Sequence, residues 1–274
     1  MSIDYEVEYD NRARVPEHPS IAQRWAEDSL RYRNAGHATL DIPYGAGERQ
    51  KFDLFIAAGA GEPVVVYIHG GYWQRGDRRD YSCIAQGLNA RGVTVAVPSY
   101  TLCPAETVSG IVAEMRECLR VVWQKTGRRP VVVGHSAGGH LAAAMLATNW
   151  STVQGVPADL VKAAYSISGV FDLPPLIGTT LNTALRLDAN TARAASPMFW
   201  HPPTRECRFV AAVGGLESSE FLRQSLDLAE VWSRAGVKAE CVVVPQCNHF
   251  TIVDELMRHE SAMLDRIAGF AAGQ

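Results

Sequence analysis

Four short segments of the chain are almost entirely apolar and rich in β-branched residues, and this repeated pattern limits the possible folds. A strand that is buried on both faces of a sheet has such a continuous apolar sequence, and stretches with helical periodicity separate the four segments. The segments are residues 63–71, 93–100, 130–136 and 162–170, and the helical stretches are 79–90, 106–125 and 137–148. Strands that alternate with such helices form βαβ units, which predicts an α/β fold with a mostly parallel sheet and helices on both faces.

The sequence on either side of this region extends the predicted sheet. An N-terminal helix followed by an antiparallel hairpin is expected over residues 18–57, at one edge of the sheet. An irregular segment near 171–205 is expected to be a small insertion or lid. The regular pattern then resumes with two strands and two helices, at 207–215, 238–245, 218–235 and 250–272. We therefore expect one domain over residues 1–274.

Composition and charge argue against several classes of function. The net charge is −3 and no basic run is visible, which argues against nucleic-acid binding. The N-terminus is polar, and no apolar run approaches about 18 residues, so we expect neither secretion nor a membrane partner. Six scattered cysteines without a CxxC pair favour reduced thiols in a cytoplasmic protein. The sequence leaves the oligomeric state undetermined, and a homodimer is compatible with it.

The segment GHSAGG at 134–139 carries the pattern GxSxG between a predicted strand and a predicted helix. In that setting a sharp turn holds the serine in a strained conformation and exposes its Oγ, and glycines are needed where side chains would collide. The helix that follows directs its free N–H groups at the position where negative charge develops. A lone GxSxG also occurs by chance, but this setting favours Ser136 as a nucleophile.

A nucleophilic serine needs an acid and a histidine base, which follow it along the chain in that order in this kind of site. His249 lies in a short loop after a predicted strand, whereas His259 lies in a predicted helix, where a solvated side chain is usual. For the acid, Glu217 directly follows a predicted strand. Glu220 falls in the first turn of a helix, where it would complement the helix dipole, and Asp172 follows an earlier strand. We favour Glu217 as the acid and His249 as the base.

The segment HGGYW at 69–73 follows the first buried strand, where this kind of fold provides oxyanion donors. Glycines let the main chain approach a carbonyl oxygen, although a Gly-Gly pair also occurs in ordinary turns. We expect an oxyanion hole that is formed by Gly70, Gly71 and Tyr72 together with the N–H of Ala137. We expect His69 to hold the loop in place and not to act as a base.

Three residues that lie close in sequence to predicted site residues remain open to more than one interpretation. Tyr72 and Trp73 would suit a flat, apolar substrate, but Trp73 could equally well pack against the insertion. Cys247 lies close to His249, and a structural thiol is favoured over a functional one.

Together these motifs resemble the α/β-hydrolase type of arylformamidase, also called kynurenine formamidase, from about residue 60 to the C-terminus. The segments are HGGYWQRGD, PSYTLCP, GHSAGGHLAA, LNTALRLD followed by SPMFW, VGGLESSEFLRQS and NHF. The resemblance implies an α/β-hydrolase fold and hydrolysis of N-formyl-L-kynurenine to formate and L-kynurenine in tryptophan breakdown, without a metal or other cofactor. It also places the acid at Glu217, where the best-known members have aspartate.

Two other hypotheses remain. A general carboxylesterase would use the same residues on simple esters. A binding protein on a hydrolase scaffold would have lost catalysis, but such proteins generally lack at least one member of the triad, and here all three positions are filled.

Overall fold

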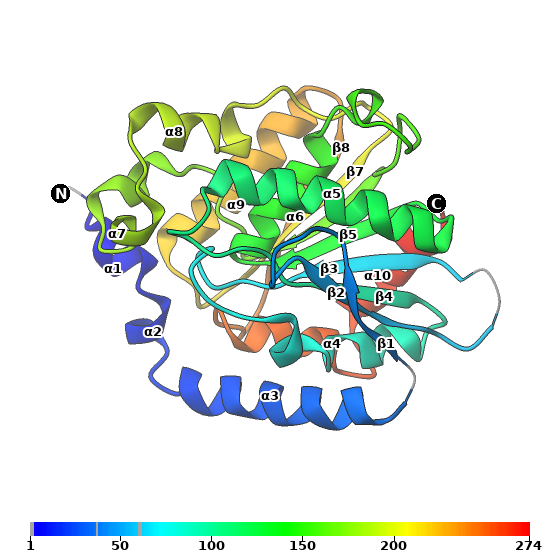
Figure 1. Ribbon diagram of the computed structural model, residues 1–274. Coiled ribbons are helices and arrows are strands. Elements are labelled where there is room, and N and C mark those ends of the chain that lie inside the picture. The colour runs from blue at the N-terminus through cyan, green and yellow to red at the C-terminus, as the bar shows by residue number, and fades with distance from the viewer. Residues whose placement is uncertain (1–2, 37, 60–61) are drawn as a thin grey trace.

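The computed structural model describes residues 3–36, 38–59 and 62–274, which contain one eight-stranded sheet (Figure 1). The strands are β1 (Ala38–Pro43), β2 (Lys51–Phe55), β3 (Val64–Ile68), β4 (Thr94–Pro98), β5 (Pro130–His135), β6 (Ala163–Ile167), β7 (Arg208–Gly214) and β8 (Lys238–Val244). Their order is β1-β2-β4-β3-β5-β6-β7-β8. The pairs β1–β2 and β2–β4 are antiparallel and all other neighbours are parallel. This confirms the predicted α/β fold, with the hairpin at the sheet edge.

The central strands of the sheet are buried on both faces, as their continuous apolar sequences predict. Every residue of β3, β4, β5 and β6 is buried, whereas β8 at the edge has no buried residue. Burial of a valine or isoleucine side chain stabilises a fold by about 1.5–3 kcal/mol. The central strands therefore form a rigid support for the loops that follow them.

Helices cover both faces of the sheet (Figure 1). On one face, α5 (Val108–Thr126), α6 (Ala137–Ala147) and α9 (Ser219–Arg234) contribute to one apolar core. On the other face, α3 (His18–Asn34), α4 (Ile84–Asn89) and α10 (Ala262–Ala272) contribute to a second core. Since β3, β5, β7 and β8 run parallel, the loops after their carboxyl ends meet at one edge of the sheet.

The insertion at 171–205 consists of short elements packed on the first core. These are η3 (Pro174–Gly178), α7 (Asn182–Leu185), α8 (Ala189–Ala194) and η4 (Pro197–Phe199). Leu173, Leu176 and Leu185 are buried in the same core as α5 and α6. The insertion is thus attached to the body of the molecule through its own apolar side chains.

Two predicted helices are shorter than expected. The stretch 79–90 divides into η1 (Arg78–Tyr81) and α4, and the stretch 250–272 divides into η5 (Thr251–Leu256) and α10. The second division arises because the Ser261 hydroxyl accepts a hydrogen bond from the Leu264 N–H and thereby starts a new helix. His259 therefore lies in the connection between two elements and not within a helix. In the described part of the chain, no helix has the length and apolar character needed to cross a membrane.

The sequence pattern predicts no element before residue 18, but the structure contains two short helices there. These are α1 (Tyr5–Tyr9) and α2 (Asn11–Arg14). Asp4 caps the first through the Val7 N–H (3.3 Å), and Asp10 caps the second through the Ala13 N–H (3.0 Å). We refer to residues 4–14 as the N-terminal strap, because they run across the edge of the molecule beside α9 and the insertion (Figure 1).

A buried charge cluster joins the N-terminal helix α3 to the sheet. Asp53 on β2 has no exposed side-chain surface and accepts hydrogen bonds from Arg33 on α3 and from Arg78 on η1. It also accepts the Asp41 main-chain N–H at 2.8 Å. Asp53 is thus shared by two guanidinium groups that are almost fully buried, of which Arg78 also pairs with Asp41.

We expect Asp53→Ala to lower the free energy of unfolding by about 3–5 kcal/mol, because both arginines lose their shared buried acceptor. The control is Asp159→Ala, which removes an exposed ion pair with Arg129 and Lys162 and should cost less than about 1 kcal/mol. Urea unfolding of both variants checks the difference. Equal losses from the two substitutions would contradict the structural role given to Asp53.

Candidate active site

Ser136 lies in the sharp turn between β5 and α6, in a backbone conformation that few residues adopt. Its φ is 55° and its ψ is −117°. A Cβ atom at Gly134 would lie 2.0 Å from the Gly138 carbonyl oxygen, and one at Gly138 would lie 1.9 Å from the Ile68 carbonyl oxygen. Glycines are therefore required on both sides of the serine, as the GxSxG pattern predicts, and the serine side chain projects from the end of the sheet.

Glu217 lies in the turn after β7 and is the acidic residue that reaches His249. One carboxylate oxygen accepts hydrogen bonds from the Ser168 hydroxyl (2.5 Å) and the Gly214 N–H (2.7 Å). The other lies 2.7 Å from Nδ1 of His249. All of these contacts are buried, so the carboxylate is held in one orientation.

The two alternative acids face other partners. Glu220 forms an ion pair with Arg223 (2.8 Å) and accepts a hydrogen bond from the Tyr9 hydroxyl (3.0 Å). Asp172 also pairs with Arg223, at 3.1 Å. The structure therefore brings Glu217 to the histidine and holds Glu220 and Asp172 in a separate cluster.

His249 lies in the loop between β8 and η5, which a local hydrogen-bond network makes rigid. The Asn248 side chain accepts the N–H groups of Phe250 (3.0 Å) and Thr251 (2.9 Å). Since a carboxylate only accepts, Nδ1 of His249 carries the proton toward Glu217, and Nε2 is left unprotonated in the neutral ring. Both His249 and Ser136 line the same cavity.

His135 is a site residue that the sequence analysis did not single out. Its Nε2 donates a hydrogen bond to the main-chain oxygen of His249 at 2.8 Å, and the centroids of the two imidazole rings lie 4.7 Å apart. Burial lowers the pKa of His135 well below its ordinary value, so the ring stays neutral. The sequence does contain one signal for His135. This residue directly precedes the serine in GxSxG and therefore lies in the same turn.

Cys247 supports the site through its main chain. Its carbonyl oxygen accepts the Leu216 N–H at 3.0 Å, which ties the loop of the histidine to the loop of Glu217. Burial raises the pKa of the Cys247 thiol, which disfavours the reactive thiolate. This agrees with the structural interpretation of the thiol.

The loop after β3 has a left-handed backbone at three successive residues. The φ angles are 112° at Gly71, 50° at Tyr72 and 56° at Trp73. In residues 3–36, 38–59 and 62–274, the N–H groups of Gly71, Tyr72 and Ala137 donate to no protein acceptor. Gly70 supports the approach of this loop, because a Cβ there would lie 3.0 Å from Cβ of Ser136. The loop thus presents free donors beside the serine.

The side chains of this loop have different surroundings. His69 is buried, its Nδ1 donates to the Gly70 oxygen at 2.8 Å, and its ring stacks on Tyr100. Tyr72 lines the cavity, but the indole of Trp73 is completely buried, edge-on to His140 with ring centroids 5.0 Å apart. The expectation that Trp73 contacts a substrate is therefore corrected, because the left-handed turn sends its side chain into the core.

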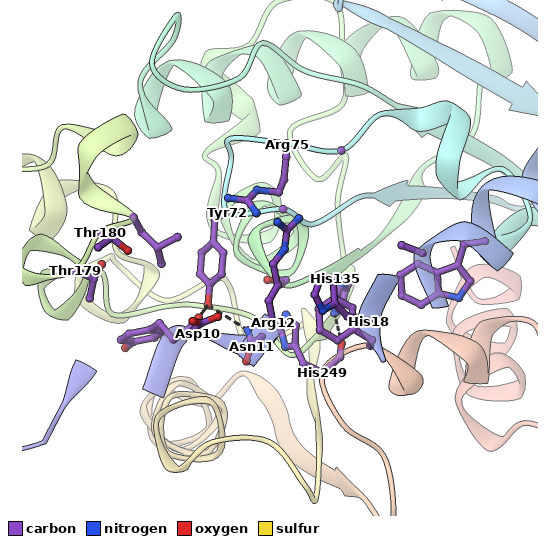
Figure 2. Close-up of a pocket in the computed structure, with 18 of the residues that line it drawn as sticks. Asp10, Asn11, Arg12, His18, Tyr72, Arg75, His135, Thr179, Thr180 and His249 are labelled. Carbon is purple, nitrogen blue, oxygen red and sulfur yellow. Dashed lines mark hydrogen bonds between the residues drawn. The ribbon is translucent and has the colours of Figure 1, made fainter. Parts of the chain in front are cut away.

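A cavity of 360 Å³ opens at this edge of the sheet. Figure 2 shows Thr179 and Thr180 of the insertion on one side of it, with His135 and His249 on the other. The other lining residues that bear on the site are Tyr9, Asp10, Asn11, Arg12, Gly71, Tyr72, Arg75, Ser136, Leu181 and Phe250. A cavity of this size lies within the range of small-molecule sites.

The N-terminal strap forms part of the cavity wall, which the sequence analysis did not anticipate. The Tyr72 hydroxyl donates to the Tyr9 main-chain oxygen (2.7 Å) and accepts from the Asn11 amide (3.2 Å), as Figure 2 shows. At its other end, Glu6 accepts the Thr180 N–H at 2.7 Å. The strap therefore connects the loop after β3 to the insertion.

Comparison with known proteins agrees with this architecture. A family model described as alpha/beta hydrolase fold matches residues 65–253. A solved structure from Silicibacter sp. tm1040, provisionally assigned as a thioesterase, is 32% identical and has a TM-score of 0.89, covering 97% of this chain and 99% of its own. An esterase of Pyrobaculum calidifontis has the same fold, with a TM-score of 0.70, 19% identity, and coverage of 93% of this chain and 91% of its own.

The fold and the family match place the chain in the α/β-hydrolase class. Kynurenine formamidase of Salmo salar is 32% identical over 84% of this chain and 81% of its own length, and that of Danio rerio is 30% identical over 83% and 80%. The chain belongs to the arylformamidase, or kynurenine formamidase, family of α/β hydrolases.

Proposed function

We propose that this protein is a serine hydrolase that cleaves N-formyl-L-kynurenine to L-kynurenine and formate. The observation that carries this proposal is the buried 2.7 Å contact between Glu217 and His249, because His249 lines the same cavity as Ser136. The relatives named kynurenine formamidase support the choice of substrate. The cavity volume suits this substrate as well.

In the first half of the reaction, Oγ of Ser136 attacks the formyl carbon while Nε2 of His249 takes the hydroxyl proton. Glu217 stabilises the imidazolium through Nδ1. The N–H groups of Gly71, Tyr72 and Ala137 donate to the oxyanion. The C–N bond then breaks, the histidine gives its proton to the departing aryl amine, and a formyl ester remains on the serine.

In the second half, water attacks the formyl ester while His249 takes one of its protons. The bond between the formyl carbon and Oγ breaks, the proton returns to the serine, and formic acid leaves and loses its remaining proton to solvent as formate. Apart from the attacking water, the donors and acceptors in both halves are main-chain or side-chain groups of this chain.

Ser136→Ala should abolish turnover of N-formyl-L-kynurenine and leave the fold intact, because the turn keeps its backbone while the attacking oxygen is lost. Hydrolysis is measured by the absorbance of the aryl amine product, and the fold by the far-UV circular dichroism spectrum. A fluorophosphonate probe should label the unmodified protein and not the variant. Undiminished turnover in the variant would refute the assignment, and folded protein without any labelling would favour a non-catalytic binding protein.

Glu217→Gln should lower kcat by roughly 10³–10⁴-fold by selecting the wrong histidine tautomer. The Gly214 N–H can only donate, so it draws the new amide oxygen to itself and turns the amide NH₂ toward His249. Nδ1 must then accept, and the proton moves to Nε2.

The control for this change is Ser168→Ala, which removes one hydrogen bond to Glu217 without altering the tautomer. It should lower kcat by no more than about 100-fold, the upper range for one hydrogen bond to a charged group, and so by less than Glu217→Gln. Steady-state kinetics of both variants provide the comparison. A kcat of Glu217→Gln within about 10-fold of the parent would count against the role of Glu217.

A general carboxylesterase is the second candidate, favoured by the esterases among the proteins with this fold. The test is a panel that compares kcat/KM for N-formyl-L-kynurenine, p-nitrophenyl acetate and a short acyl thioester. We expect the formyl amide to be preferred, because the family relatives over most of the chain are formamidases. A decisive preference for the simple ester or the thioester would reject the formamidase function and leave the serine mechanism in place.

A further inference from the structure

Two arginine side chains from separate segments meet at the cavity of the active site. Arg12 comes from α2 in the N-terminal strap, and Arg75 comes from the loop just after the oxyanion glycines. Figure 2 shows the two guanidinium groups directed toward each other beside Tyr72. Arg75 is half-buried, whereas Arg12 is exposed at the mouth of the cavity.

In the described part of the chain, neither arginine has a carboxylate partner. In residues 3–36, 38–59 and 62–274, Arg12 and Arg75 form no ion pair and no side-chain hydrogen bond. By contrast, Arg14 pairs with Glu8, Arg49 with Asp77 and Arg78 with Asp53. An exposed arginine without a partner is common, but two that converge on one cavity repel each other.

The positive charge of each arginine acts on the other. Burial lowers the pKa of Arg75, and the positive charge of Arg12 lowers it further. The acids on the cavity wall hold the strap, because Glu6 accepts the Thr180 N–H and Asp10 accepts the Ala13 N–H. A ligand that brings a negative charge between the guanidinium groups would relieve their repulsion.

We propose that Arg12 and Arg75 bind the carboxylate of the substrate and so select acyl aryl amides that carry an anionic group. This inference rests on the proposed function, whose substrate ends in an α-carboxylate. A guanidinium offers paired N–H donors that match the two oxygens of a carboxylate, which a lysine cannot do. The two residues are therefore specificity determinants and take no part in the chemical steps.

The position of Arg12 relative to Ser136 is well defined because the strap is tied to the body of the hydrolase. Glu8 accepts the Ser219 hydroxyl (2.7 Å) and the Glu220 N–H (2.9 Å) at the start of α9. Tyr9 and Asn11 both form hydrogen bonds with the Tyr72 hydroxyl, next to the predicted oxyanion donors. Arg12 follows directly, so the anion site and the reacting groups share one framework.

The test compares N-formyl-L-kynurenine with its α-carboxamide analogue, which has the same shape and lacks the negative charge. The double variant R12A/R75A should lower the ratio of the two kcat/KM values by at least about 10-fold, since a hydrogen bond to a charged group contributes about 1.5–3 kcal/mol. The matched control is R14A on the same helix, which lies outside the cavity and should leave the ratio within about 2-fold. An unchanged ratio in the double variant would overturn the inference.

A binding measurement separates this inference from the proposed function. Titration calorimetry with L-kynurenine and L-kynurenine carboxamide needs no turnover. In the unmodified protein the carboxylate form should bind at least about 10-fold more tightly, and R12A/R75A should remove that preference. If N-formyl-L-kynurenine is not hydrolysed but this preference is present, the proposed function fails and the anion site stands. If hydrolysis occurs without the preference, the anion site fails and the proposed function stands.

Discussion

The close approach of main chain to main chain behind Ser136 is the constraint on which the site depends. Gly138 packs directly against the Ile68 carbonyl at the end of β3, and Gly70 packs against the serine itself. This contact lets α6 begin directly after β5 and brings the loop after β3 beside Ser136. If either backbone moved outward by the width of a methyl group, the free N–H groups would no longer lie beside the serine.

The rest of the sheet fixes where Glu217 and His249 lie relative to Ser136. The parallel pairing of β6, β7 and β8 places the loops that carry Ser168, Glu217 and His249 side by side. Contacts between these loops, such as Leu216 with the Cys247 carbonyl, maintain that arrangement. Each position in the site is therefore determined by strand order together with a few hydrogen bonds between loops.

Features that are local in sequence could be predicted, and features that depend on distant contacts could not. The buried strands and the strand-turn-helix setting of Ser136 follow from short-range patterns, as does the position of Glu217 directly after a strand. The break before α10 depends on a single serine cap, which weighs little against a long helical pattern. Trp73 was ambiguous because its direction is decided by left-handed φ angles in a loop.

The N-terminal strap escaped prediction for a related reason. Its sequence is polar and its helices are very short, so neither periodicity nor apolar runs mark it. Its place is decided by bonds to Thr180, Glu220 and Tyr72, all far away in the sequence. These tertiary contacts, and not the local sequence, hold the segment at the cavity.

The N-terminal strap and the turn around Ser136 differ in how well they tolerate substitution. At Gly134 and Gly138 the space for a side chain is already filled by other backbone atoms, so almost any substitution there disrupts the fold. On α2, Arg12, Ala13 and Arg14 are exposed, and their side chains can change with little effect on the core. Substitutions on α2 can therefore alter the mouth of the cavity, which Arg12 lines, while the turn around Ser136 keeps its geometry.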